Sequence, residues 1–157
     1  MELAPEGMLI TPASIDLPLY NEDLHEQGDP AEVIKLKEQI SKADAVLIVT
    51  PEYNYSVPGV LKNAIDWVSR PPEQPFNGKP VAIMGASPGK FGSARAQYHL
   101  RQTFVCLNAA VLNKPEVMVG GVMGVFDDNG QMTDQATREH IAKQLVALAV
   151  LVDEKSR

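Results

Sequence analysis

Two polar loops in this sequence carry residues suited to binding a flat aromatic ligand. The first loop follows the apolar run 45–49 and combines aromatic rings with carboxylate, amide and hydroxyl groups. Its candidate residues are Pro51, Glu52, Tyr53 and Asn54. A planar heteroaromatic ring needs a face to lie against, and donors and acceptors along its polar edge. This loop therefore predicts a binding site for such a ring.

The second loop follows the next apolar run and adds Ser87, Gly89 and Gly92. Glycine lets the backbone approach a ligand closely, and the serine hydroxyl can form hydrogen bonds. The residues alone support a purely structural interpretation equally well, in which Tyr53 and Tyr55 plug the end of a sheet and the glycines only make turns. Neither loop has the glycine spacing of a phosphate-binding motif.

Other familiar chemistries lack their motifs. The histidines His25, His99 and His140 do not have the spacing of metal ligands, so we expect them to be solvated or locally paired. The sequence contains no C-x-x-C or H-E-x-x-H pattern, so a zinc centre is not indicated. GASPG (85–89) has the G-x-S-x-G spacing, but this spacing alone does not indicate a Ser/His nucleophile. Cys106 lies in an apolar stretch, and we expect it to be a small buried residue.

The composition predicts one compact domain over residues 1–157, with 45% apolar and 22% charged residues. A net charge of −6 argues against a nucleic-acid or anionic-membrane surface, since both favour a basic protein face. We expect neither a membrane span nor a secretory signal. The single cysteine fits a reducing compartment, and we therefore expect a cytoplasmic protein.

Periodicity and turn residues predict the order of elements. A strand over 8–15 precedes a helix over 30–42, which Asp29 caps and Pro30 opens. The run 45–50 predicts a strand buried on both faces of a sheet, and a helix over 58–69 follows it.

The second half of the chain continues the alternation. It predicts a strand over 80–86, a helix over 93–108, a last strand region formed by 110–112 and 116–119, and a terminal helix capped at Thr133-Asp134. Alternating strands and helices indicate an α/β protein with a doubly wound parallel sheet. The two polar loops should then lie at the same edge and form one crevice.

Several segments resemble the bacterial NAD(P)H-dependent FMN reductases of flavodoxin-like fold, the group that includes soluble quinone and chromate reductases. The main one is PEYNYSVPGVLKNAIDW (51–67). The others are DLPLYNEDL (16–24), ADAVLIVTPEYN (43–54), GKPVAIMGASPG (78–89), ARAQYHLRQ (94–102) and NKPE (113–116). The resemblance covers essentially the whole chain, and the PEYN segment followed by a proline and a helix is specific.

The resemblance implies that FMN binds in the crevice, with residues 51–54, Ser87, Gly89 and Gly92 around its ring. Relatives often carry two glycines where this chain has Gly92-Ser93. NAD(P)H would be the co-substrate, and a quinone or a similar small molecule, with chromate as a further candidate, would accept two electrons. The flavin performs the redox step, so these residues position it and no side chain need act as an acid or base.

A second set of residues is placed by the resemblance near the flavin and a subunit interface, and comprises Tyr55, Arg95, Tyr98 and Glu116. Arg95 would pair with Glu116 within a homodimer or homotetramer; the alternative is a surface ion pair worth at most about 1 kcal/mol. Trp67 lies off the apolar stripe of its helix. It is predicted to be either an interface residue or a partly exposed surface aromatic.

The N-terminus departs from the family pattern. Relatives begin with a strand, a G-S-L-R-x-x-S-x-N loop that holds the FMN phosphate, and a helix. In this chain ELAPEGM (2–8) resembles the end of that helix. The absent strand would lie between the second and third strands of a 2-1-3-4-5 sheet. Its loss would cost about 6–12 kcal/mol, against a domain's total of about 5–15 kcal/mol.

This N-terminal truncation predicts marginal stability and weak FMN binding. A start codon assigned too late, a fragment, or a rearranged fold would each account for it. Two other functions therefore remain open from the sequence: a flavin-binding electron carrier without its own nicotinamide reaction, and an inactive truncated fragment.

Overall fold

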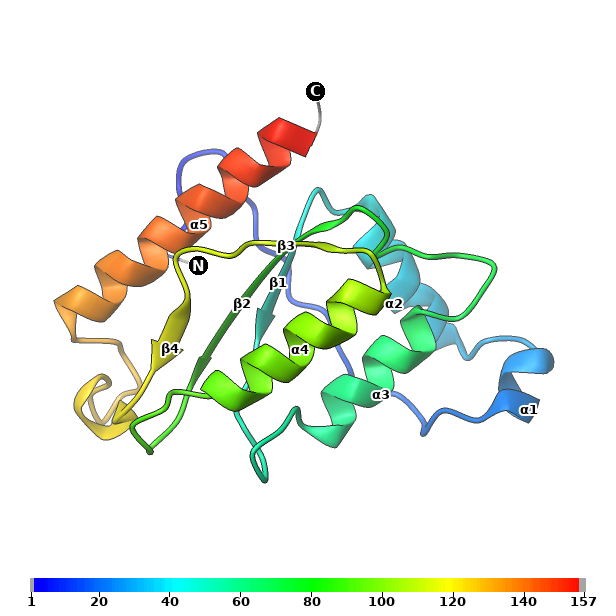
Figure 1. Ribbon diagram of the computed structural model, residues 1–157, viewed down its shortest axis with the longest axis horizontal. Coiled ribbons are helices and arrows are strands. Elements are labelled where there is room, and N and C mark those ends of the chain that lie inside the picture. Colours follow the sequence, from blue (N-terminus) through cyan, green and yellow to red (C-terminus); the bar gives the residue numbers. More distant parts are fainter. Residues whose placement is uncertain (1, 156–157) are drawn as a thin grey trace.

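A computed structural model describes residues 2–155 and shows a parallel sheet built around one central strand (Figure 1). The central strand β2 (Pro80–Ala86) pairs on one side with β1 (Val46–Val49). On its other side β2 pairs first with β3 (Ala110–Val111) and then with β4 (Val117–Val119). β3 and β4 thus form one interrupted line beside β2, and all pairings are parallel.

Helices cover both faces of this sheet. One face carries α2 (Ala31–Lys42), α3 (Gly59–Val68) and α4 (Ala94–Cys106), and the other carries α5 (Gln135–Lys155). Two short elements complete the fold, α1 (Glu22–Glu26) and the 3₁₀ helix η1 (Val122–Gly124). The predicted doubly wound α/β arrangement is therefore confirmed, although α1 was not predicted.

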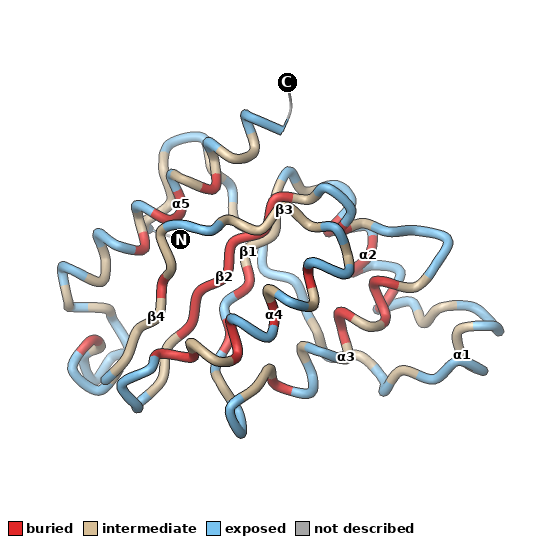
Figure 2. The backbone as a smooth tube through the Cα atoms, viewed as in Figure 1, coloured by how far each residue is buried: buried red, intermediate tan, exposed pale blue. Residues whose placement is uncertain are grey.

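Two apolar clusters hold the layers together, one on each face of β2. On the first face, Ile48 and Ile83 of the sheet pack with residues of α2, α3 and α4, among them Leu100. On the second face, Met84 packs against Ile141 and neighbouring residues of α5. Figure 2 shows β2 buried along its length between these layers, because its continuous apolar run offers side chains to both faces.

The first predicted strand is absent, and this changes the role of β1. Residues 8–15 form no strand, although Met8 and Ile10 pack against the α5-side cluster. Among residues 2–155, nothing pairs with the outer edge of β1. The prediction of a strand buried on both faces is therefore wrong for this run: Ile48 is buried but Val49 is 68% exposed.

Residues 16–29, which we call the strap, cross the outer face of α3 and bury its tryptophan. Trp67 is 0% exposed, and its indole N–H donates to the carbonyl of Pro18 at 2.8 Å. The ring of Tyr20 meets it edge-on, with centroids 4.8 Å apart, and Asn63 also donates to Pro18. Both predictions for Trp67 are wrong, because this chain's own strap covers the side chain.

The strap is also tied to α2 by Asp29. Its carboxylate lies 2.6 Å from Nδ1 of His25 and 2.6 Å from Nζ of the buried Lys37. The predicted cap is therefore wrong: Pro30 is the N-cap of α2, and no side chain caps the helix. Burial raises the pKa of Asp29, but the hydrogen bonds from Lys37 and His25 outweigh it and lower the pKa.

We expect Trp67→Phe to lower the free energy of unfolding by about 1–3 kcal/mol, because it removes the hydrogen bond to Pro18 and leaves a small void. Urea unfolding followed by circular dichroism measures this. Val105→Ala, at an exposed position of α4, should change stability by less than about 0.5 kcal/mol. Equal stability of the Trp67 variant and the unaltered chain would contradict the assignment.

Asp29→Asn should destabilise the chain in a pH-dependent way. Because the pKa of Asp29 in the folded chain is lowered from 3.8, its stabilising effect is present above that pH and is lost as the pH falls through the folded value. The difference in free energy of unfolding between the unaltered chain and Asp29→Asn should therefore be largest near neutral pH and should shrink toward zero in acid. Asp44→Asn, at an exposed position, serves as the control and should show no such trend.

Candidate functional site

The two polar loops lie at the same edge of the sheet, as predicted, because β1 and β2 run parallel and both end there. The first loop makes a tight turn in which Tyr53 and Ser56 exchange backbone hydrogen bonds of 3.1 and 2.9 Å. Asn54 and Tyr55 have φ of 49° and 64°, which is the backbone of a type I′ turn. Asparagine tolerates this conformation, whereas tyrosine is strained in it.

The second loop is tied to the segment after β4. The Ser87 N–H donates to Val119, the Ser87 hydroxyl donates to the Gly89 carbonyl at 3.1 Å, and the Gly121 N–H also donates to Gly89. Gly89 is exposed, and a side-chain carbon there would have only the Ser87 hydroxyl nearby, at 3.8 Å. Its surface is therefore open to a ligand.

Gly92 has a different role from Gly89. It is buried with φ of 53°, and an added Cβ would overlap the backbone of Met118. The close packing of the loop against β4 therefore requires a glycine at this position. Ser93 follows, also with positive φ, and is buried.

Glu52 joins the first loop to the start of α4. Its Oε2 accepts hydrogen bonds from the backbone N–H groups of Arg95 and Ala96, at 2.9 and 3.1 Å. Its Oε1 accepts one from Nη1 of Arg95 at 3.2 Å. Burial raises the pKa of Glu52, but these bonds prevail and lower it from the ordinary value. Glu52 is thus a carboxylate whose oxygens face protein donors.

The guanidinium of Arg95 lies between two aromatic rings. It is 4.1 Å from the centroid of Tyr55 in the first loop and 4.5 Å from that of Phe91 in the second. Cations are attracted to aromatic faces at such distances. Arg95 therefore links the two loops by contacting a ring of each, in addition to its ion pair with Glu52. Phe91 was not among the predicted site residues, and no motif singles it out.

Within the chain Arg95 does not pair with Glu116, and their predicted pairing at a subunit interface stays a prediction. Glu116 pairs instead with Lys114 at 2.9 Å. The hydrogen bond from Lys114 lowers the pKa of Glu116, and Arg101 and the Tyr98 hydroxyl act in the same direction. The four predicted network residues therefore separate into two groups, Tyr55 with Arg95 and Tyr98 with Glu116.

Several groups at the loops have no partner in the chain. Among residues 2–155, the backbone N–H groups of Glu52, Asn54 and Gly89 donate to no protein acceptor, and the ring of Tyr53 is exposed. Donors beside an exposed ring suit the edge and face of a flat heteroaromatic ligand. The first N–H groups of α4, in contrast, are occupied by Glu52.

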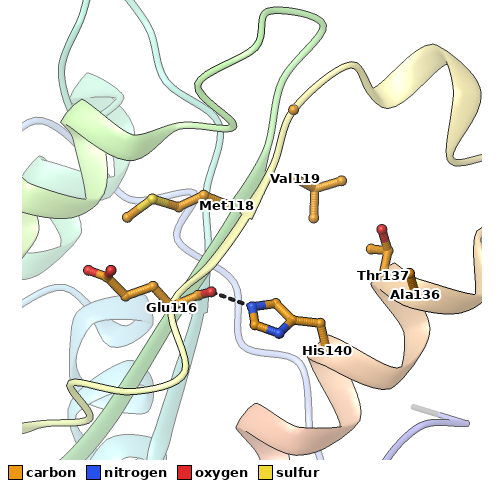
Figure 3. Close-up of a pocket in the computed structure, with 7 residues that line it drawn as sticks. Glu116, Met118, Val119, Ala136, Thr137 and His140 are labelled. Atoms are coloured by element: carbon orange, nitrogen blue, oxygen red, sulfur yellow. Dashed lines mark hydrogen bonds between the residues drawn. The ribbon is translucent and has the colours of Figure 1, made fainter.

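A separate hollow lies between β4 and the first turns of α5 (Figure 3). It has a volume of about 530 Å³ and is lined by Glu116, Met118, Val119, Gly120, Ala136, Thr137 and His140. Nε2 of His140 lies 2.6 Å from the Glu116 carbonyl oxygen. No residue of 50–57 or 87–93 lines this hollow, so it is distinct from the predicted crevice.

Other candidate residues have local roles or none. Nδ1 of His99 lies 2.9 Å from the Ser56 hydroxyl, and with His25 and His140 each histidine is paired locally, as predicted. Cys106 is exposed, so the prediction that it is buried is wrong; α4 turns Phe104 toward the sheet instead. Within residues 2–155, no cluster of histidine, cysteine or acidic side chains could hold a metal ion.

A parallel α/β sheet with helices on both faces and two polar loops at one edge is typical of the flavodoxin-like class. Comparisons with known proteins identify the family. Residues 2–124 match the family model of NADPH-dependent FMN reductases. The chain is 59% identical to an NAD(P)H-dependent FMN reductase of Pseudomonas aeruginosa, over 96% of this chain and 82% of that protein. The chain therefore belongs to the NADPH-dependent FMN reductase family.

Two further comparisons agree with this assignment. A quinone reductase of Escherichia coli is 52% identical, over 96% of this chain and 82% of its own length. The solved structure of FerB, a flavoenzyme NAD(P)H:acceptor oxidoreductase from Paracoccus denitrificans, superposes with a TM-score of 0.88 at 35% identity, over 98% of this chain and 85% of FerB. The predicted flavodoxin-like fold, and the predicted FMN and NAD(P)H chemistry at the level of the family, are confirmed.

One finding bears on membranes. No helix within residues 2–155 is long and apolar enough to span a bilayer.

The two loop glycines should respond differently to a small side chain. Gly92→Ala should lower the free energy of unfolding by about 1–3 kcal/mol, because of its positive φ and the overlap with Met118. Gly89→Ala should change it by less than about 0.5 kcal/mol, since the added carbon meets open space. Thermal or urea unfolding of both variants measures this. A larger loss for Gly89→Ala than for Gly92→Ala would contradict the geometry.

Proposed function

We propose that this chain is an FMN-containing oxidoreductase that takes hydride from NAD(P)H and passes electrons to quinones or similar small-molecule acceptors. One observation supports it most: Glu52 and Arg95 bring the PEYN loop beside the second loop, at the edge where a parallel sheet holds its ligands. The names of the relatives support the choice of a quinone as acceptor.

In this proposal the seven predicted residues divide into groups with different roles. The free N–H groups of Asn54 and Gly89 would donate to the polar edge of the flavin ring, and Pro51 and Tyr53 would provide surfaces beside it. Ser87 holds Gly89 in place through its hydroxyl. Glu52 and Gly92 position the loops rather than contact the flavin through side chains. FMN, when bound, supplies the hydride-accepting chemistry.

We further propose that the protein self-associates, as a homodimer or homotetramer in the cytoplasm. The exposed rings of Tyr55 and Phe91 flank Arg95, and Tyr98, three residues later on α4, is exposed as well. Exposed aromatic residues and arginine are enriched in the cores of protein interfaces. A second copy covering this face would place the subunit boundary beside the flavin.

The test is to add FMN to the purified chain and to follow flavin fluorescence, then to measure oxidation of NADH and NADPH with and without benzoquinone or chromate. We expect saturable FMN binding and faster oxidation with quinone. Gly89→Val should weaken FMN binding by about tenfold or more, because its side chain would occupy the ring's place, with an unchanged melting temperature. A chain that never binds FMN would overturn the proposal.

A further inference from the structure

The start of α4 lacks the side-chain cap that its own sequence could have supplied. Ser93 occupies the N-cap position, but its backbone is left-handed and its hydroxyl makes no capping bond. A helix start leaves N–H groups that need acceptors. Here the acceptor comes from a residue 43 positions earlier in the chain, the carboxylate of Glu52, which accepts from Arg95 and Ala96.

The same carboxylate is held from its other side. Nη1 of Arg95 donates to Oε1 of Glu52, and the rings of Tyr55 and Phe91 confine the guanidinium. The Glu52 side chain is only 11% exposed, so water competes weakly for these bonds. Charge-assisted hydrogen bonds in such surroundings are stronger than neutral ones, and an anion is favoured at a helix start.

The first loop has few other attachments. Its tight turn is strained at Tyr55. Apart from the bonds of Glu52, a side-chain hydrogen bond between Ser56 and His99 connects this loop to α4. Loss of the Glu52 carboxylate would leave the loop held to α4 by that exposed contact and by the Tyr55 ring against Arg95. The position of the loop relative to α4 and Phe91 therefore depends on Glu52.

We propose that Glu52 and Arg95 are a positioning pair, in which the Glu52 carboxylate caps α4 from the opposite loop and so sets the opening that receives the flavin ring. This inference rests on the proposed function. It assigns the Glu52 side chain to the protein scaffold, whereas the family resemblance placed Glu52 among the residues around the flavin ring. It also makes the charge of Glu52, as well as its shape, a determinant of flavin affinity.

The first experiment uses hydrogen exchange without flavin. Glu52→Gln and Glu52→Ala should both speed amide exchange at Arg95 and Ala96 and in residues 53–56, with the larger effect for alanine. Glu38→Ala is the matched control, because Glu38 is an exposed residue of α2 paired only with Lys42; it should leave those amides unchanged. Unchanged exchange in both Glu52 variants would overturn the inference.

The second experiment measures FMN affinity by fluorescence titration. Glu52→Ala should weaken binding by about tenfold or more, and added formate, which supplies a carboxylate without the side chain, should restore part of the loss. Formate should not raise the affinity of the unaltered chain or of Glu38→Ala. Unchanged affinity in Glu52→Ala, or a loss that formate does not reduce, would contradict the assigned role of the charge.

A double-mutant comparison tests the pairing itself. Arg95→Met alone should weaken FMN binding, and Glu52→Ala with Arg95→Met should bind about as weakly as Glu52→Ala, because the two residues act together. Losses that multiply would show independent roles and overturn the pair. If the unaltered chain takes up no FMN, the proposed function fails, while the exchange experiment still decides whether the pair holds the loops.

Discussion

A single carboxylate connects the two loops on which the candidate site depends. A parallel sheet brings the ends of its strands to one edge, but it does not set how far apart the loops beyond those ends lie. In this chain Glu52 sets that separation, because its carboxylate accepts hydrogen bonds from the N–H groups of Arg95 and Ala96 in the first turn of α4. The strained turn at Tyr55 and the confined guanidinium of Arg95 both lie beside this contact.

The sheet itself is organised around β2, which is buried up to its last residue, Ala86, and pairs with each of the other strands within residues 2–155. β1, in contrast, has a partner on only one side within the described residues. Val49 of this edge strand is exposed, because no neighbouring strand within the described residues lies beside it on the outer side. Edge position thus explains why an apolar run typical of a central strand is only partly buried.

Local patterns predicted most of the elements. The helices α2, α3 and α4 and the strand β2 agree with the predicted ranges within two residues at each end, since apolar spacing and turn residues act over short distances. Residues 8–15 have an equally strand-like pattern and form none, because a strand needs a paired neighbour that its own residues do not supply. The cap on α4 could not be predicted either, as its acceptor lies far away in the sequence.

By itself, then, the sequence determined the alternation of strands and helices, the two polar loops at one sheet edge and, through the PEYN segment, the FMN reductase family. Only the tertiary structure decided the partners of particular side chains within the chain: Glu52 for Arg95, and the strap rather than solvent or a subunit for Trp67. The physical reason is that periodicity reflects contacts within one element, whereas pairing between elements depends on which surfaces meet after folding.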